Sequence, residues 1–151
     1  MRFRTAVQAT PELRAHLKPA LEALGAAAQS GVHVPEQGRL SGSVDIDAAL
    51  RGQLQNEPRW DYAIGYRTGR RDDRVYYVEQ HKAEATEVGR VLGKKQWLER
   101  WLATTPLDGV RPRDFVWLSA GGVRIPANSP AARLLSLHGV TLLRRLVLSA
   151  R

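Results

Sequence analysis

The sequence contains no cysteine, a single methionine and only two phenylalanines among its 151 residues. Without cysteine the chain can form neither disulfides nor thiolate metal sites. No apolar run approaches the roughly 18 residues that a membrane-spanning helix needs. The first residues, MRFRTAVQATPELR, also lack the apolar centre of a signal peptide. We therefore expect a cytoplasmic protein without a membrane partner.

The composition is that of a folded domain. Apolar residues make up 43% of the chain and charged residues 25%, close to the average for globular proteins, which argues against disorder. A chain of this length can bury a core of its own. We expect one domain that spans residues 1–151.

Positive charge is in excess, with a formal net charge of +8 and a pI of about 10.6. Lysine is scarce, so arginine supplies most of this charge, and from Arg111 onward the only acid is Asp114. Arginine binds phosphate through a planar two-pronged contact, and a basic surface attracts polyanions over some distance. The charge favours a nucleic-acid partner, DNA more than RNA. A GC-rich genome would also enrich arginine codons, so composition alone does not decide the function.

The first half of the chain gives one clear helical pattern and one ambiguous region. Thr10 and Pro11 suit a helix start, and leucines follow at helical spacing, which predicts an amphipathic helix over residues 11–29. Residues 32–58 are less regular. RLSGSVDID could form a short strand, and DIDAALRGQL could form a helix capped by Ser43 or Asp45. Both options stay open.

A β-hairpin is predicted in the middle of the chain. WDYAIGYR, from Trp60 to Arg67, and RVYYVEQHK, residues 74–82, are both typical of strands. TGRRDD between them supplies the glycine and aspartates of a turn.

The segment after the hairpin predicts a helix over residues 84–103, because its apolar residues share one face. Lys95 lies within this apolar stripe, between Leu92 and Leu98. Lys94 and Gln96 flank Lys95 but fall off the stripe. A lysine that points toward a sheet invites a functional explanation.

The last third predicts a strand, a helix and a second strand. DFVWLSA is a short apolar strand, Ser129-Pro130 begins a helix, Gly139 ends it, and VTLLRRLVLS forms the final strand. This order predicts a right-handed parallel crossover. The expected fold is an α/β domain with a mixed sheet of four or five strands, flanked by helices.

Acidic and basic side chains gather at one end of the predicted hairpin. In the second strand Glu79 and His81 share a face, and antiparallel pairing brings Asp61 of the first strand near them. Whether Asp61 and Glu79 point to the same side depends on the register, which the sequence does not fix. If they do, the two carboxylates can bind Mg²⁺ or Mn²⁺, which can orient a water and neutralise phosphate charge.

This arrangement resembles the PD-(D/E)xK phosphodiesterase superfamily of nucleases. The resemblance covers the element order over residues 10–149 and implies a restriction-endonuclease-like fold. It makes Asp61 and Glu79 the metal-binding acids and places His81 where the family has a lysine. Two substitutes are open: His81 as a ligand or proton acceptor, or Lys95 from the next helix, a known variation in the superfamily.

The hairpin turn carries four arginines that we expect to contact nucleic acid, Arg67, Arg70, Arg71 and Arg74. In the alternative, Asp72 and Asp73 pair with them in a solvated turn. The resulting hypothesis is a metal-dependent endonuclease or exonuclease acting on DNA or RNA, with Asp61, Glu79, His81 and Lys95 as catalytic residues. The alternative is a catalytically degenerate nuclease-fold protein that serves as a nucleic-acid-binding or protein-interaction module. A homodimer or a partner protein is compatible with either hypothesis.

Overall fold

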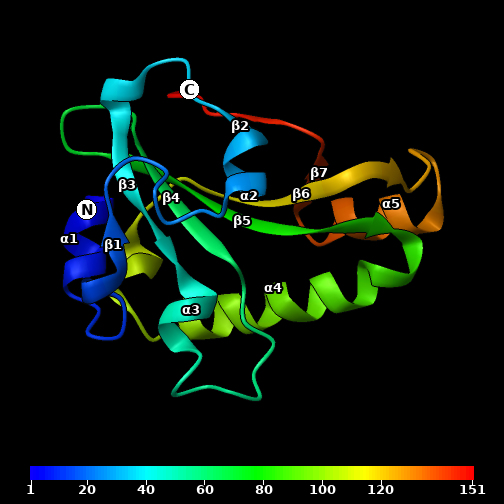
Figure 1. Ribbon diagram of the computed structural model, residues 1–151, viewed down its shortest axis with the longest axis horizontal. Coiled ribbons are helices and arrows are strands. Elements are labelled where there is room, and N and C mark those ends of the chain that lie inside the picture. Colours follow the sequence, from blue (N-terminus) through cyan, green and yellow to red (C-terminus); the bar gives the residue numbers. More distant parts are fainter.

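The computed structural model describes all 151 residues as an α/β fold built on a mixed six-stranded sheet (Figure 1). In spatial order the strands are β1 (Leu17–Lys18), β3 (Leu40–Asp45), β4 (Tyr62–Arg67), β5 (Asp73–Glu84), β6 (Arg113–Arg124) and β7 (Val140–Leu143). A separate two-stranded parallel sheet joins β2 (Val32–His33) to β8 (Leu146–Val147).

Five α-helices connect or cover the strands: α1 (Phe3–Gln8), α2 (Ala26–Ser30), α3 (Ile46–Leu50), α4 (Val88–Leu102) and α5 (Pro130–Leu137). Four short 3-10 helices complete the fold: η1 (Arg14–His16), η2 (Gln37–Arg39), η3 (Ala85–Glu87) and η4 (Pro106–Gly109). None of these helices combines the length and the hydropathy that a bilayer span requires.

The sheet changes from antiparallel to parallel at β5. Strands β3, β4 and β5 pair antiparallel, and the predicted hairpin is confirmed with Tyr62 opposite Val78 and Arg67 opposite Asp73. Strand β5 then pairs parallel with β6, and β6 pairs parallel with β7, across the helices α4 and α5. The predicted strand-helix-strand unit is therefore present, in a sheet with more strands than expected.

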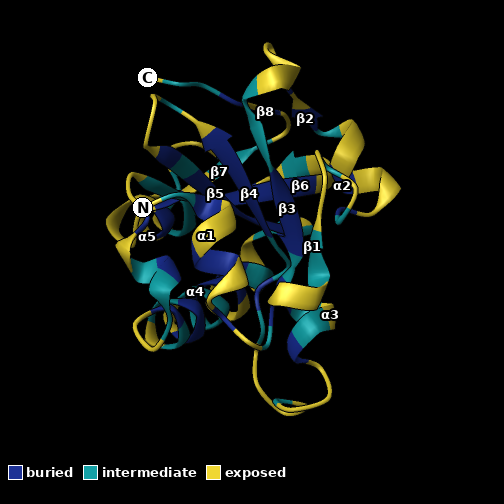
Figure 2. Ribbon diagram, turned by 90° about the vertical axis from the view of Figure 1, so that its left-hand side faces the viewer, coloured by how far each residue is buried: buried dark blue, intermediate teal, exposed yellow.

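Both faces of the sheet are buried, and the strands form the dark centre of Figure 2. The face under α1, α4 and α5 forms one core, which includes Ala63, Tyr77 and Trp117; we call it the α4-side core. The opposite face forms a second core with α2, β2 and β8, which includes Ile64 and Val116. Since successive strand residues alternate faces, odd-numbered residues of β4 and β5 belong to the α4-side core.

The predicted helix over residues 11–29 is wrong. Pro19 cannot continue a helix, and Ala20 adopts a positive φ of 50° that a helix excludes. The chain forms η1, β1 and α2 instead. Its leucines separate, so that Leu13 lies in the α4-side core and Leu24 in the opposite core.

The two open options for residues 32–58 are both present, in succession. Strand β3 leads directly into α3, and the Asp45 side chain accepts a hydrogen bond from the Ala48 amide, 2.8 Å away, as the cap of that helix. The expected last strand is divided into β7 and β8, which belong to different sheets. Strand β6 is longer than expected because Gly121 and Gly122 continue it.

Helix α1 packs directly on the hairpin. The Phe3 ring lies against Gly65 of β4, and the Phe3 amide donates a 2.7 Å hydrogen bond to the buried carboxylate of Asp73. A methyl group added at Gly65 would come within 2.4 Å of the Phe3 ring and 2.7 Å of its Cβ. The absence of a side chain at Gly65 is what allows this close packing.

We therefore expect Gly65→Ala to lower the free energy of unfolding by about 1–3 kcal/mol, the usual cost of overpacking a core. Gly93→Ala is the matched control, because nothing lies within 4 Å of its added methyl group and Gly93 lies inside α4. That control should raise the free energy of unfolding by about 0.5–1 kcal/mol through helix propensity. Urea unfolding followed by circular dichroism measures both, and a Gly65→Ala protein as stable as the wild type would contradict the packing described.

Candidate active site

Glu79 is a fully buried carboxylate between the sheet and helix α4. It follows Val75 and Tyr77 on the α4 side of β5, and its side chain has no exposed surface. Strand β6 places Trp117 directly beside it. A buried carboxylate requires partners that replace water, so the groups around Glu79 define the site.

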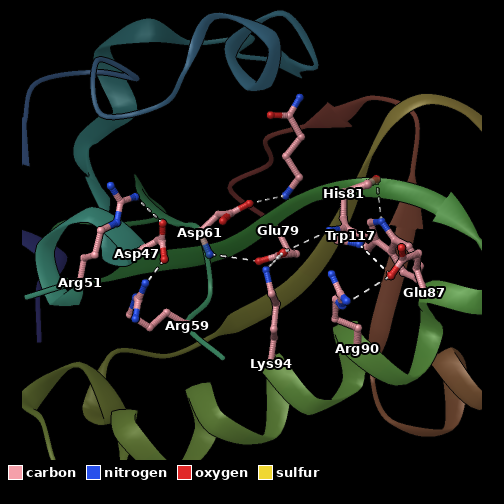
Figure 3. A network of polar contacts seen from close by, with 11 residues as sticks. Asp47, Arg51, Arg59, Asp61, Glu79, His81, Glu87, Arg90, Lys94 and Trp117 are labelled. Carbon is pink, nitrogen blue, oxygen red and sulfur yellow. Dashed lines mark hydrogen bonds and ion pairs between the residues drawn. The ribbon is translucent and has the colours of Figure 1, made fainter. Parts of the chain in front are cut away.

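Asp61 is held at the point where β4 begins. Its carbonyl oxygen accepts hydrogen bonds from the amides of Ile46, at 2.8 Å, and Asp47, at 3.4 Å, at the start of α3. The Asp47 carboxylate in turn pairs with Arg51 and Arg59, as Figure 3 shows. This network fixes the chain that leads into Asp61.

Asp61 and Glu79 come together through two reciprocal hydrogen bonds (Figure 3). The Asp61 amide donates to Oε1 of Glu79 at 3.1 Å, and the Gln80 amide donates to Oδ2 of Asp61 at 3.0 Å. Strand β4 begins at Tyr62, opposite Val78, so the carboxylate of Asp61, one residue earlier, occupies the edge of β5 where the ladder stops. The register brings the two predicted acids side by side.

Burial makes both carboxylates hard to ionise. Burial, with the nearby charge of Asp61, raises the pKa of Glu79 to about 8, although Lys94 opposes this shift. Burial also raises the pKa of Asp61, against the charge of Lys94 and the hydrogen bond from Gln80. Two carboxyl groups therefore share one site with a single ammonium group in contact, and burial favours the protonated form of each.

Lys94, and not Lys95, is the lysine that reaches the acids. Lys94 Nζ lies 2.5 Å from Oε2 of Glu79, and its side chain is 19% exposed. Lys95 instead donates to the His138 carbonyl at 2.6 Å, pairs with Glu99 at 3.1 Å and lies over the Phe115 ring. The expected position of Lys95 in the site is corrected to Lys94.

The two lysines separate because of helix geometry. Lys94 and Lys95 follow Val91 by three and four residues. Both therefore lie on the helix face that Val91 marks, but on opposite sides of the centre of that face. Lys94 thus points toward β5, and Lys95 toward β6 and the end of α5. Both ammonium groups are directed toward the sheet, and only one meets carboxylates there.

His81 lies at the margin of the acid pair. Its Nε2 lies 3.2 Å from the Glu87 carboxylate, and its Nδ1 is 3.9 Å from Oε2 of Glu79 (Figure 3). The hydrogen bond with His81 lowers the pKa of Glu87. Trp117 donates its indole N–H to the His81 carbonyl at 3.0 Å, which fixes the backbone here. Glu87, on the turn before α4, was not among the predicted residues. Its spacing from His81 matches neither a strand nor a helix period, so the sequence did not indicate that the two side chains meet.

The predicted arginine cluster of the turn is divided. Arg74 forms a two-pronged ion pair with Asp114, at 2.5 and 3.0 Å. Arg67, Arg70 and Arg71 are exposed. Asp73 pairs with Arg2 at 3.5 Å and with none of the turn arginines.

The donor set fits a hard divalent cation. Asp61 and Glu79 offer carboxyl oxygens at one point, and a cation bound there would favour their ionised forms. Mg²⁺ commonly takes one or two carboxylates and completes its shell with water and substrate oxygens. No group of three or more acidic or histidine side chains with metal-binding geometry occurs in the structure.

Comparison of the chain with family models, with curated proteins and with solved structures finds no match.

The raised pKa of Glu79 predicts a pH-dependent stability. The folded state holds the Glu79 proton up to about pH 8, whereas the unfolded chain releases it near pH 4.5, so the free energy of unfolding should fall as pH rises between these values. Glu79→Gln cannot titrate, and its melting temperature should fall less over the same interval. Calorimetric scans from pH 5 to pH 8.5 compare the two slopes. Parallel slopes would contradict a raised pKa.

Proposed function

We propose that this protein hydrolyses phosphodiester bonds of DNA or RNA with Mg²⁺ or Mn²⁺ as cofactor. The observation that carries the proposal is the acid pair itself: Asp61 and Glu79, from two neighbouring strands, meet with the Lys94 ammonium on Glu79. A paired set of acids with a lysine is the donor set that phosphoryl chemistry uses, because it can hold a cation and stabilise developing negative charge.

The order of elements supports the proposal. The acids lie on an antiparallel hairpin, the lysine lies on the helix that follows, and two parallel strands complete the sheet. This order is similar to that of the PD-(D/E)xK nucleases, where the lysine usually stands two residues after the second acid. Here His81 takes that position, and Lys94 supplies an ammonium from the helix.

Each residue has a distinct role in this proposal. Asp61 and Glu79 hold the cation, which when bound neutralises phosphate charge and lowers the pKa of a water. Lys94 places a fixed positive charge beside the acids, where it can hold the attacking water or a phosphate oxygen. Glu87 orients the His81 ring, which supplies a nitrogen base at the margin of the acid pair.

A protein that binds nucleic acid without cleaving it is the second candidate. The contact of 2.5 Å between Lys94 and Glu79 favours it, since the lysine already neutralises one of the two acids. The position of the family lysine is also occupied by His81, whose ring has a different reach and charge.

Cleavage assays with the two neighbouring lysines test the proposal. Labelled DNA and RNA, single- and double-stranded, should be cut only when Mg²⁺ or Mn²⁺ is present. Asp61→Asn and Lys94→Met should each reduce the rate by about 100-fold or more, the usual loss when one preorganised charge is removed. Lys95→Met should stay within about threefold of the wild type, because its ammonium group is bonded to His138 and Glu99.

Circular dichroism of each variant establishes that it is folded. Cleavage that survives in Asp61→Asn, or that persists in EDTA, would rule the proposed mechanism out. Equal losses in Lys94→Met and Lys95→Met would remove the assigned role of Lys94. If the wild type retards nucleic acid in a gel but cuts none of the substrates with either cation, the second candidate is supported.

A further inference from the structure

An arginine-lined groove lies at the far end of the hairpin from the acid pair. Residues of the start of α1, the short helix η2 and the β4–β5 turn line it, around a volume of about 550 Å³. No apolar side chain lines it; the lining residues are Arg2, Glu36, Gly38, Arg39, Arg67, Thr68, Gly69 and Arg70. We refer to it as the arginine groove. Four guanidinium groups thus face one carboxylate.

Two of the four guanidinium groups in the arginine groove, those of Arg67 and Arg70, have no acidic partner. Arg67 contacts a backbone carbonyl, that of Gly38 at 3.3 Å, and no acid. Arg70 is exposed and makes no hydrogen bond or ion pair. Arg39 pairs with Glu36 at 2.8 Å and also donates to the Arg67 carbonyl at 3.0 Å. Each guanidinium carries five N–H donors, so these contacts leave most donors free.

The surroundings also hold three of the four guanidinium groups in place, those of Arg2, Arg39 and Arg67. The contacts between Arg39 and the Arg67 carbonyl, and between Arg67 and the Gly38 carbonyl, join η2 to the end of β4. Arg2 is held by Asp73 at 3.5 Å. Arginines that are already positioned lose little side-chain entropy when they bind an anion. The groove is therefore a prepared site for an anion with several oxygens.

We propose that the arginine groove binds the phosphodiester backbone of a nucleic acid, with Arg67 and Arg70 as its principal contacts. The proposal takes its ligand class from the proposed function. A row of phosphates matches several guanidinium groups in one open groove, and arginine binds phosphate in a two-pronged manner. The groove replaces the turn cluster as the expected contact surface. It adds Arg2 and Arg39 and leaves out two of the predicted arginines: Arg71, which does not line it, and Arg74, which is paired with Asp114.

The distance to the acid pair sets the size of the ligand. Asp61 and Arg67 lie at opposite ends of β4, six residues apart, which corresponds to about 20 Å along a strand. That distance spans about six base-pair steps of a duplex. A nucleic acid that reaches both sites is thus a polymer and not a mononucleotide.

Binding without a divalent cation tests the groove independently of catalysis. Fluorescence anisotropy in EDTA measures the affinity for a labelled duplex or single strand, of DNA or RNA, long enough to reach both sites. For the best-bound probe, Arg67→Gln/Arg70→Gln should weaken binding by about tenfold at moderate salt and lower the slope of log K against log salt by about 2. Arg144→Gln/Arg145→Gln is the matched control: it removes the same charge at exposed arginines outside the groove and should change affinity less than threefold.

Arg70→Glu, at an exposed side chain without partners, provides a second variant if the double substitution unfolds the protein. It should weaken binding at least as much as the double variant does. The groove is refuted if the wild type binds none of the probes, or if the groove variants and the control lose affinity equally. A protein that never cleaves but shows the groove dependence would refute the proposed hydrolysis alone. Metal-dependent cleavage with equal binding by both double variants would refute the groove alone.

Discussion

The structure depends at its centre on a carboxylate that has been removed from water. Glu79 lies under α4 with no exposed surface, and its neighbour Asp61 adds a second carboxyl group. A charge in such a place is costly unless it is paired and hydrogen-bonded. The Asp61 amide and the Lys94 ammonium supply that pairing only in part. Natural sequences rarely retain such an arrangement in a core for stability alone. We therefore interpret these residues as a candidate functional site.

The sequence predicted those parts of the fold whose signals are local. The hairpin turn, the cap at Ser129 and the positive φ of Gly139 all lie where residue chemistry placed them, because each depends on a few adjacent residues. The helix expected over residues 11–29 is wrong because Pro19 and the positive φ of Ala20 interrupt the leucine periodicity. The number of strands was underestimated because β1, β2 and β8 have two residues each and exist only through their partners.

The sequence placed the two acids near each other but chose the wrong lysine. Asp61 and Glu79 follow from strand alternation together with antiparallel pairing, and the register of the structure brings them together. The choice between Lys94 and Lys95 depends on how α4 is rotated about its axis over the sheet. The two lysines are adjacent on the helix, so periodicity alone does not resolve which of them faces the acids. The arginine groove was beyond sequence reasoning, since Arg2 and Arg39 join the β4–β5 turn only in the folded chain.

The start of β4 at Tyr62 has a consequence for the edge of β5. Before Tyr62 the β4–β5 ladder has not begun, and the Asp61 carboxylate accepts a hydrogen bond from the Gln80 amide in place of a strand carbonyl. A side chain can rotate away from such a bond, whereas a strand carbonyl cannot. A ligand that draws the Asp61 side chain aside therefore exposes the Gln80 amide at the edge of the acid pair. An oxygen of that ligand can then accept the hydrogen bond. Deuterium uptake at this one amide is a natural gauge of whether the aspartate is turned toward the protein or toward a ligand.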